Sequence, residues 1–120
     1  MLKRIFSDNS WSLADGNAVV LTVAESMDGG KAVVTLSGEL RGDTAPALRD
    51  ELVALATVGA DIVLDLRGLT DISFECQRAL VTVQQQMDSL ERGQLTIRGV
   101  PEAIFRKLRQ YSLQELLMIE

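Results

Sequence analysis

The most continuous apolar stretch of the chain is DIVLDL at residues 61–66. After the initial Asp61, only Asp65 interrupts it. A short run of this kind, rich in β-branched residues, is typical of a central strand that is covered on both faces. Gly68, Leu69 and several polar residues follow, and they predict a turn and then a helix that begins near Ser73. Helix N-termini above the carboxyl ends of strands present free N–H groups. We therefore expect ligands or partners to bind there.

Two stretches before this strand also have β-strand patterns. Val19–Glu25 alternates apolar and polar residues, and Lys31–Ser37 is similarly rich in β-formers. Between them lie Gly29 and Gly30, which can adopt positive φ. The pattern predicts a β-hairpin with its turn at 28–30.

Three helices are expected from apolar residues that recur every three or four positions. The first is capped by Asp43 or Thr44 and runs to about residue 58. The second spans about 74–91, and Arg92 and Gly93 are expected to end it. Pro101 opens the third helix, which ends near residue 110. On the second helix we expect a polar face made of Gln77, Gln84, Gln85 and Asp88.

The remaining elements are short. Residues 94–98 predict a strand, and the tail is either a last turn with a strand at 116–119, which we favour, or a fourth helix. The resulting order is β-β-α-β-α-β-α-β. Strand–helix–strand alternation after a leading hairpin predicts a mostly parallel sheet with an antiparallel edge.

Residues 1–17 form a leader that we treat as an N-terminal arm, separate from a domain at residues 18–120. It carries Leu2, Ile5, Phe6 and the chain's only tryptophan, Trp11, among polar residues. The arm is either a strand laid across the domain, a segment that forms a homodimer or docks a partner, or, least favoured, a helix on a membrane surface.

Composition and charge exclude several classes of function. The 120 residues carry a net charge of −5, which gives no electrostatic support to nucleic-acid binding. There is no histidine, so Ser-His and Cys-His nucleophiles and the commonest metal ligand are missing. No spacing forces two carboxylates together, and no glycine-rich phosphate loop is present. We expect a protein that is not an enzyme and that binds no metal or cofactor.

The single cysteine, Cys76, cannot form an internal disulfide, which favours a reducing cytoplasm. The first residues lack the apolar core of a signal peptide, and no stretch approaches the roughly 20 apolar residues of a membrane span. A cytoplasmic location is therefore expected.

Several motifs, taken together and in register, resemble the STAS domain family, named for sulfate transporters and anti-sigma-factor antagonists. They are LSGEL at 36–40 followed by Thr44-Ala45, VLDLRGLT at 63–70, and the late strand with Gly93, Leu95 and Ile97. The resemblance covers roughly residues 19–119. It implies an α/β, STAS-like fold with a four- or five-stranded mixed sheet, a leading β-hairpin and three or four helices.

The resemblance also implies a function, together with one departure from the family pattern. In such proteins a serine at the helix start is phosphorylated by a partner kinase that is also an anti-sigma factor, and phosphorylation releases the complex. In register, Ser73 stands where the family has Asp, Phe74 where it has the phosphorylated Ser, and Glu75 where it has the next Ser. Arg41 replaces the acidic residue that usually follows Glu39-Leu40.

These substitutions leave alternatives open. Glu75 is either a favourable first-turn residue or a permanent charge that resembles the phosphorylated state. Phe74 either fills the core or anchors a partner. Ser73 caps the helix or is a displaced phosphorylation site, with Thr70 and Thr44 as weaker candidates for modification. Cys76 is a buried structural thiol or, less favoured, a redox sensor.

The reading that best fits these features is a protein–protein interaction module in bacterial partner switching, which affects transcription through an anti-sigma-factor-like or related signalling partner. Two alternatives are a sensor of a small ligand or nucleotide and an accessory subunit of a transport complex. The residues expected to contact the partner are Asp71, Ser73, Phe74, Glu75, Gln77, Glu39, Arg41 and Thr44.

Overall fold

A computed structural model describes residues 1–91 and 93–120, so the expected helix stop at Arg92 lies outside the described residues. The strands form one six-stranded sheet in the order β1-β2-β3-β4-β5-β6. They are β1 (Leu2–Phe6), β2 (Ser10–Asp15), β3 (Ala18–Asp28), β4 (Lys31–Leu40), β5 (Asp61–Ile72) and β6 (Leu95–Arg98). The helices are α1 (Ala45–Thr57), α2 (Phe74–Leu90) and α3 (Glu102–Gln110), with 3₁₀ turns η1 (Gly42–Thr44) and η2 (Leu113–Leu116).

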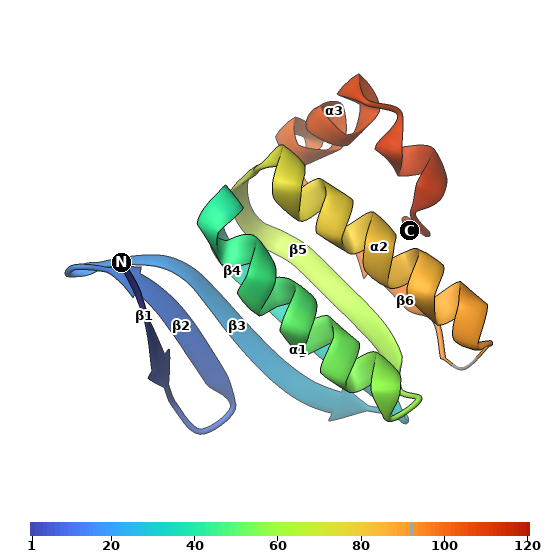
Figure 1. Cartoon of the computed structure of the whole chain (residues 1–120), viewed down its shortest axis with the longest axis horizontal. Helices are drawn as coiled ribbons and strands as arrows, with labels where there is room; N and C mark the ends of the chain where they lie inside the picture. The colour runs from blue at the N-terminus through green and yellow to red at the C-terminus, as the bar shows by residue number, and fades with distance from the viewer. Residues whose placement is uncertain (92) are drawn as a thin grey trace.

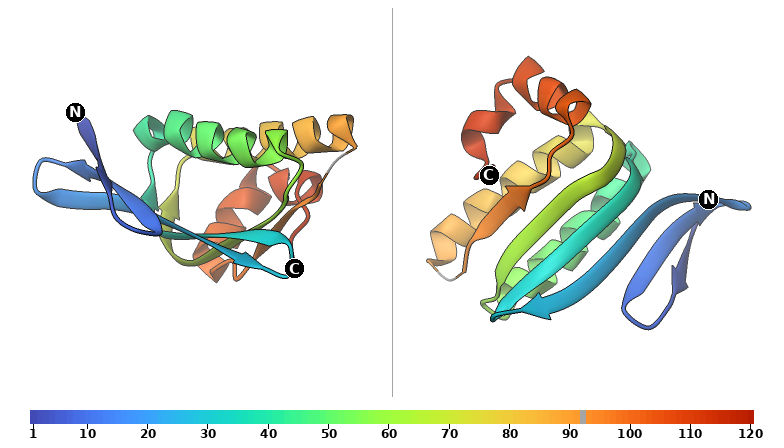
Figure 2. Two further views of the ribbon diagram at one scale, coloured as in Figure 1. Left: turned by 90° about the horizontal axis from the view of Figure 1, so that it is seen from below. Right: turned by 180° about the vertical axis from the view of Figure 1, so that it is seen from behind.

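Helices α1 and α2 lie side by side over one face of the sheet, and α3 lies near the start of α2 (Figures 1 and 2). Side chains of the strands and both helices fill the space between the layers. The buried core of β5 is made of Ile62, Leu64 and Leu66, each 0% exposed. Leu48 and Leu52 of α1 and Leu80 and Met87 of α2 are equally buried. The strand expected from DIVLDL is confirmed and is covered on this face, but it is the fifth of the six strands and not the central one.

The mixed α/β sheet is confirmed, but it has six strands rather than four or five. The leader supplies two strands, β1 and β2. Trp11 and Leu13 of β2 are buried, whereas most of β1 is exposed. Three strand pairs are antiparallel and two are parallel, so the prediction of a mostly parallel sheet is wrong. Among the described residues, strand β1 pairs only with β2. Whether its other edge forms a homodimer stays a prediction.

The predicted hairpin is confirmed in β3 and β4, with Gly29 and Gly30 at φ +58° and +82°. The predicted turn at Gly68 is wrong, because β5 continues to Ile72. Two register shifts in the β4–β5 pairing let the strands remain paired through Leu40 and Ile72. Gly68 lets β5 lie close to β4, because a Cβ at this position would lie 2.8 Å from Ser37 Oγ.

Three other expectations need correction. Asp43 and Thr44 make no side-chain cap on α1, because a 3₁₀ turn precedes the helix. Gln77 and Gln84 are only 2% and 3% exposed, so the polar face of α2 is narrower than its glutamines suggest. The tail forms η2 and a single parallel bridge from Ile119 to Ile97 instead of a strand over 116–119.

Candidate functional site

The start of α2 is fixed directly beside the end of β4. The Ser73 amide donates to the Leu40 carbonyl at 2.7 Å, which continues the contact between the two strands. Ser73 Oγ then accepts a hydrogen bond from the Cys76 amide at 3.2 Å. The expected N-cap role of Ser73 is therefore confirmed, and the first turn of α2 has a defined position above the sheet.

Replacing Ser73 with alanine is expected to lower the free energy of unfolding by about 1 kcal/mol, because an amide of the first turn loses its acceptor. Ser89→Ala is the matched control, since Ser89 is an exposed residue near the other end of α2. Urea unfolding followed by circular dichroism measures both. Equal midpoints for the two variants would contradict the capping role.

Below the first turn of α2 lies the η1 turn. Thr44 Oγ1 donates to the Arg41 carbonyl at 2.8 Å, and Cys76 Sγ donates to the same carbonyl at 3.2 Å. Thr44 and Cys76 are both 0% exposed. These bonds satisfy the turn's carbonyl in the interior and join the start of α1 to the start of α2. Thr44 is thus a structural residue and cannot contact a partner in this conformation.

Burial raises the pKa of the Cys76 thiol above its ordinary value. Because the thiolate is the reactive form, Cys76 is expected to react at least tenfold more slowly with a thiol reagent in the native protein than in the unfolded chain. Labelling with and without denaturant, read by mass spectrometry, tests this. Comparable rates in the two states would instead favour an accessible redox thiol.

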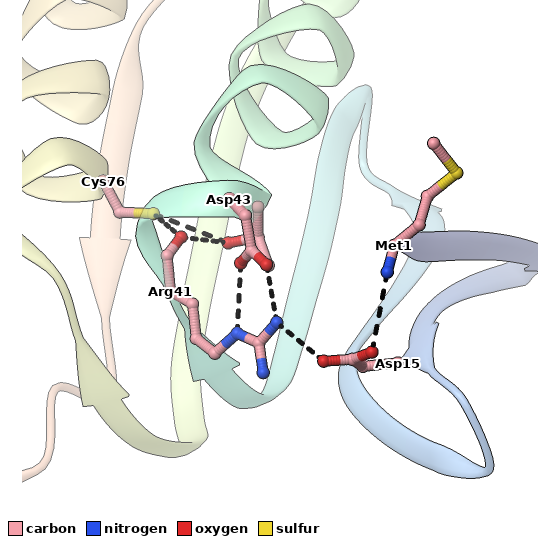
Figure 3. A network of polar contacts seen from close by, with 6 residues as sticks. Met1, Asp15, Arg41, Asp43 and Cys76 are labelled. Atoms are coloured by element: carbon pink, nitrogen blue, oxygen red, sulfur yellow. Dashed lines mark hydrogen bonds and ion pairs between the residues drawn. The ribbon is translucent and has the colours of Figure 1, made fainter.

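Arg41 connects the site to the N-terminal strands (Figure 3). Its Nε donates to Asp43 Oδ1 at 3.0 Å, and its Nη2 lies 2.5 Å from Asp43 Oδ2 and 3.5 Å from Asp15 Oδ2. Asp15 also lies 3.8 Å from the amino group of Met1. The Arg41 guanidinium holds the pKa of Asp43 below its usual range. The positive charge of Arg41 is therefore already matched by two carboxylates.

An aromatic pair lies on the surface at the start of α2. The rings of Phe74 and Tyr111 are 4.7 Å apart between centroids, and the two residues are 42% and 52% exposed. The guanidinium carbon of Arg78 lies 6.0 Å from the centroid of the Phe74 ring. Phe74 is therefore an exposed aromatic residue, and the alternative in which it fills the core is wrong.

A groove of about 510 Å³ runs beside this pair, between the first turns of α1 and α2. Its lining mixes small, aromatic and charged residues: Gly42, Ala45, Pro46, Arg49, Phe74, Glu75, Arg78, Ala79 and Thr82. Glu75 is exposed and leans over η1, since a Cβ on Gly42 would lie 3.3 Å from Glu75 Oε2. The groove thus presents one negative charge and two positive charges around an apolar floor.

Asp71 and Glu39 lie at the ends of adjacent strands, where they are paired in the sheet register and exposed. Asp71 forms an ion pair with Lys107 of α3, and this hydrogen bond lowers the pKa of Asp71. Half-exposed pairs of this kind contribute little to stability. The pair does link the end of β5 to α3, the helix that precedes Tyr111.

The expected site residues therefore divide into two groups. Asp71, Phe74, Glu75 and Glu39 are exposed, and Ser73 and Arg41 are half-buried. Thr44 and Gln77 are buried, because the η1 turn and the packed side of α2 enclose them. The sequence reasoning missed Tyr111, Arg78 and Lys107. Tyr111 is the sole tyrosine of the sequence, but nothing in its spacing relates it to Phe74.

Two features are absent from the described part of the chain. Among residues 1–91 and 93–120, no three His, Cys, Asp or Glu side chains are grouped closely enough to hold a metal ion. Within the same residues, no helix has the length and apolar character needed to cross a membrane.

The comparisons with known proteins agree with this geometry. A family model described as "Mlab, STAS domain" matches residues 16–119. The chain belongs to that family. A comparison with curated proteins found no match.

Solved structures with the same fold include an anti-sigma factor antagonist from Mycobacterium paratuberculosis, at TM-score 0.73 and 20% identity, covering 82% of this chain and 84% of that one. The Bacillus cell fate determinant SpoIIAA in its phosphorylated form matches at TM-score 0.63 and 14% identity, covering 82% and 90%. The murine anion transporter Slc26a9 matches at TM-score 0.58 and 14% identity, covering 91% of this chain and 17% of that one. This chain is thus a STAS domain that resembles anti-sigma-factor antagonists.

Proposed function

We propose that this STAS domain is a non-catalytic module that binds a regulatory protein through the surface at the start of α2, in a bacterial partner-switching system. We define the α2-start surface as Phe74, Glu75, Arg78 and Tyr111 together with Arg49 of the adjoining groove. The observation that carries the proposal is the exposed Phe74–Tyr111 pair. Aromatic residues and arginine are the types that dominate binding energy at protein interfaces.

The charges of this surface favour a protein partner of mixed charge. Glu75 places a carboxylate near the N-terminus of α2, where the helix dipole favours negative charge. Arg49 and Arg78 lie on the other sides of the groove. An anionic small ligand would meet the carboxylate of Glu75 at the helix start, which disfavours the nucleotide-sensor alternative. A protein can instead match all three charges over a larger area.

We further propose that binding is not switched by phosphorylation at the start of α2, at position 74 or at Ser73. Phe74 has no hydroxyl group, so it cannot accept a phosphoryl group. Glu75 supplies one permanent negative charge next to that position, whereas a phosphoserine supplies about −1.5 to −2. Under this hypothesis the domain has one binding state, and the amount of the partner determines how much of the complex forms. Ser73 is the remaining hydroxyl at the helix start, and its Oγ is already an acceptor for the Cys76 amide.

Phe74→Ala is expected to weaken binding of the cognate partner about 10- to 100-fold, because a half-exposed aromatic anchor is lost while the core is untouched. The partner is first captured from a lysate of the source cells with the wild-type domain. Its dissociation constant is then measured by calorimetry with each purified variant.

Leu90→Ala is the matched control for this measurement, because Leu90 is 50% exposed at the opposite end of α2. It is expected to bind the partner as the wild type does. Equal affinities for Phe74→Ala and the wild type would contradict the proposed surface. A phosphopeptide covering Ser73 after incubation with the partner and ATP would contradict the absence of phosphoryl switching.

A second candidate is an accessory subunit of a transport complex. The observation that favours it is the similarity in fold to a domain within the murine anion transporter Slc26a9. Both candidates use a protein partner, so the identity of the captured protein distinguishes them. A transporter subunit in the capture would favour the second, and a kinase-like or anti-sigma-factor protein would favour the first.

A further inference from the structure

A second hollow also lies beside α1, and its lining shares no described residue with the groove of the α2-start surface. It has a volume of about 440 Å³ and is enclosed by the β1–β2 hairpin, the ends of β3 and β4, and the C-terminal half of α1. This size lies within the range of small-molecule sites. We refer to it as the hairpin pocket.

The floor of the hairpin pocket is apolar and includes Trp11, Met27 and Leu55. Trp11 is 7% exposed, and the guanidinium carbon of Arg4 lies 4.1 Å from the centroid of its ring. Trp11 Nε1 is buried and has no hydrogen-bond partner among the described residues. A buried indole N–H usually finds an acceptor, so this donor indicates a missing partner.

The polar part of the pocket is acidic. Asp8, Glu25 and Glu51 all contribute to the lining, whereas no lysine or arginine of residues 1–91 and 93–120 does. Glu25 Oε1 is buried and also lacks a hydrogen-bond partner among the residues that the structure describes. An unpaired acceptor of this kind is costly to bury. The pocket therefore holds one donor and one acceptor without partners, next to additional negative charge.

We propose that the hairpin pocket binds a small organic cation, namely an amine or guanidinium carried on an apolar stem that also bears a hydrogen-bond acceptor. The cationic group satisfies Glu25 and is attracted by Asp8 and Glu51. The apolar stem packs on Met27 and Leu55. The acceptor of the ligand takes the hydrogen bond from Trp11 Nε1.

Trp11 makes this proposal directly testable, because the only tryptophan of the chain lines the pocket. The probe is N-(aminopropyl)benzamide, which combines an amine, an aromatic stem and an amide carbonyl. Its neutral and anionic analogues are N-(hydroxypropyl)benzamide and benzamidobutyrate. Each is titrated into the full chain, and Trp11 fluorescence is excited at wavelengths where the probes do not absorb.

The amine is expected to give a saturable change in fluorescence and to bind about tenfold more tightly than the alcohol, with the carboxylate weakest. Glu25→Gln is expected to remove this preference for the amine. Glu115→Gln, which changes an exposed glutamate on η2, is the matched control and is expected to bind like the wild type. Circular dichroism confirms that each variant is folded.

Trp11→Phe keeps an aromatic ring and removes the indole N–H, and its binding is followed by amide chemical shifts in place of fluorescence. It is expected to bind the amine several-fold more weakly than the wild type. Absence of saturation, equal binding of the alcohol or carboxylate, or unchanged affinity in Glu25→Gln would overturn the proposal. Unchanged affinity in Trp11→Phe would likewise contradict it.

Discussion

Gly38→Ala is expected to lower the free energy of unfolding by about 3 kcal/mol or more. Gly38 has φ +104°, and a Cβ at this position would lie 2.2 Å from the Val20 carbonyl oxygen on the neighbouring strand. The clash is with backbone, so β3 and β4 must separate to relieve it. The same residue lies beside the second register shift that lets β4 and β5 stay paired as far as Leu40 and Ile72.

The matched control is Gly16→Ala. Gly16 has φ +63°, and no described atom lies within 4 Å of the place a Cβ would take. Alanine at position 16 therefore has the unfavourable backbone conformation without the clash. We expect a loss of about 1 kcal/mol for this variant. Chemical unfolding of both proteins separates the two contributions. If Gly16→Ala and Gly38→Ala lowered the free energy of unfolding equally, the clash with the Val20 carbonyl oxygen would not be the cause of the loss at Gly38.

Leu64→Ala is the second large expected effect, with a loss of about 3 to 4 kcal/mol in the free energy of unfolding. Leu64 of β5 is 0% exposed and belongs to the same buried core as Leu52 of α1 and Leu80 of α2. Truncation removes apolar contacts and leaves a cavity in the middle of the core.

Leu90→Ala serves as the control here as well, because a leucine that is 50% exposed loses far fewer contacts. It is expected to cost under about 1 kcal/mol. Calorimetric melting or urea titration measures the difference. A small loss for Leu64→Ala would contradict the assignment of β5 as the centre of the core.

The sequence predicted the elements that have strong periodicity. The run at 61–66 is a covered strand, and the stripes on the three helices face the core, because burial of apolar residues decides both. The hairpin turn followed from Gly29 and Gly30, where backbone geometry restricts the choice of residue. Family membership followed from several weak motifs in the correct order.

Features that depend on contacts between distant residues could not be predicted. Residues 68–72 read locally as a turn, and only the pairing with β4 makes them strand. Gln77 reads as polar surface, although neighbouring elements bury it. Tyr111 contacts Phe74 only because the fold brings the end of α3 close to the start of α2.

The α2-start surface and the hairpin pocket both lie beside α1, and no described residue lines both. The α2-start surface lies near Ala45, and the hairpin pocket includes Leu55. Each site can therefore be mutated without changing a residue of the other, so protein binding and cation binding can be tested separately.

The most direct test of the central claim is a map of the partner's footprint by amide chemical-shift perturbation on the labelled domain. If the partner binds the α2-start surface, shifts on adding the captured partner concentrate at Phe74, Arg78, Tyr111 and Arg49, and Leu90 is unaffected. A footprint centred on the β1–β2 hairpin, or on the face of the sheet away from α1 and α2, would contradict it.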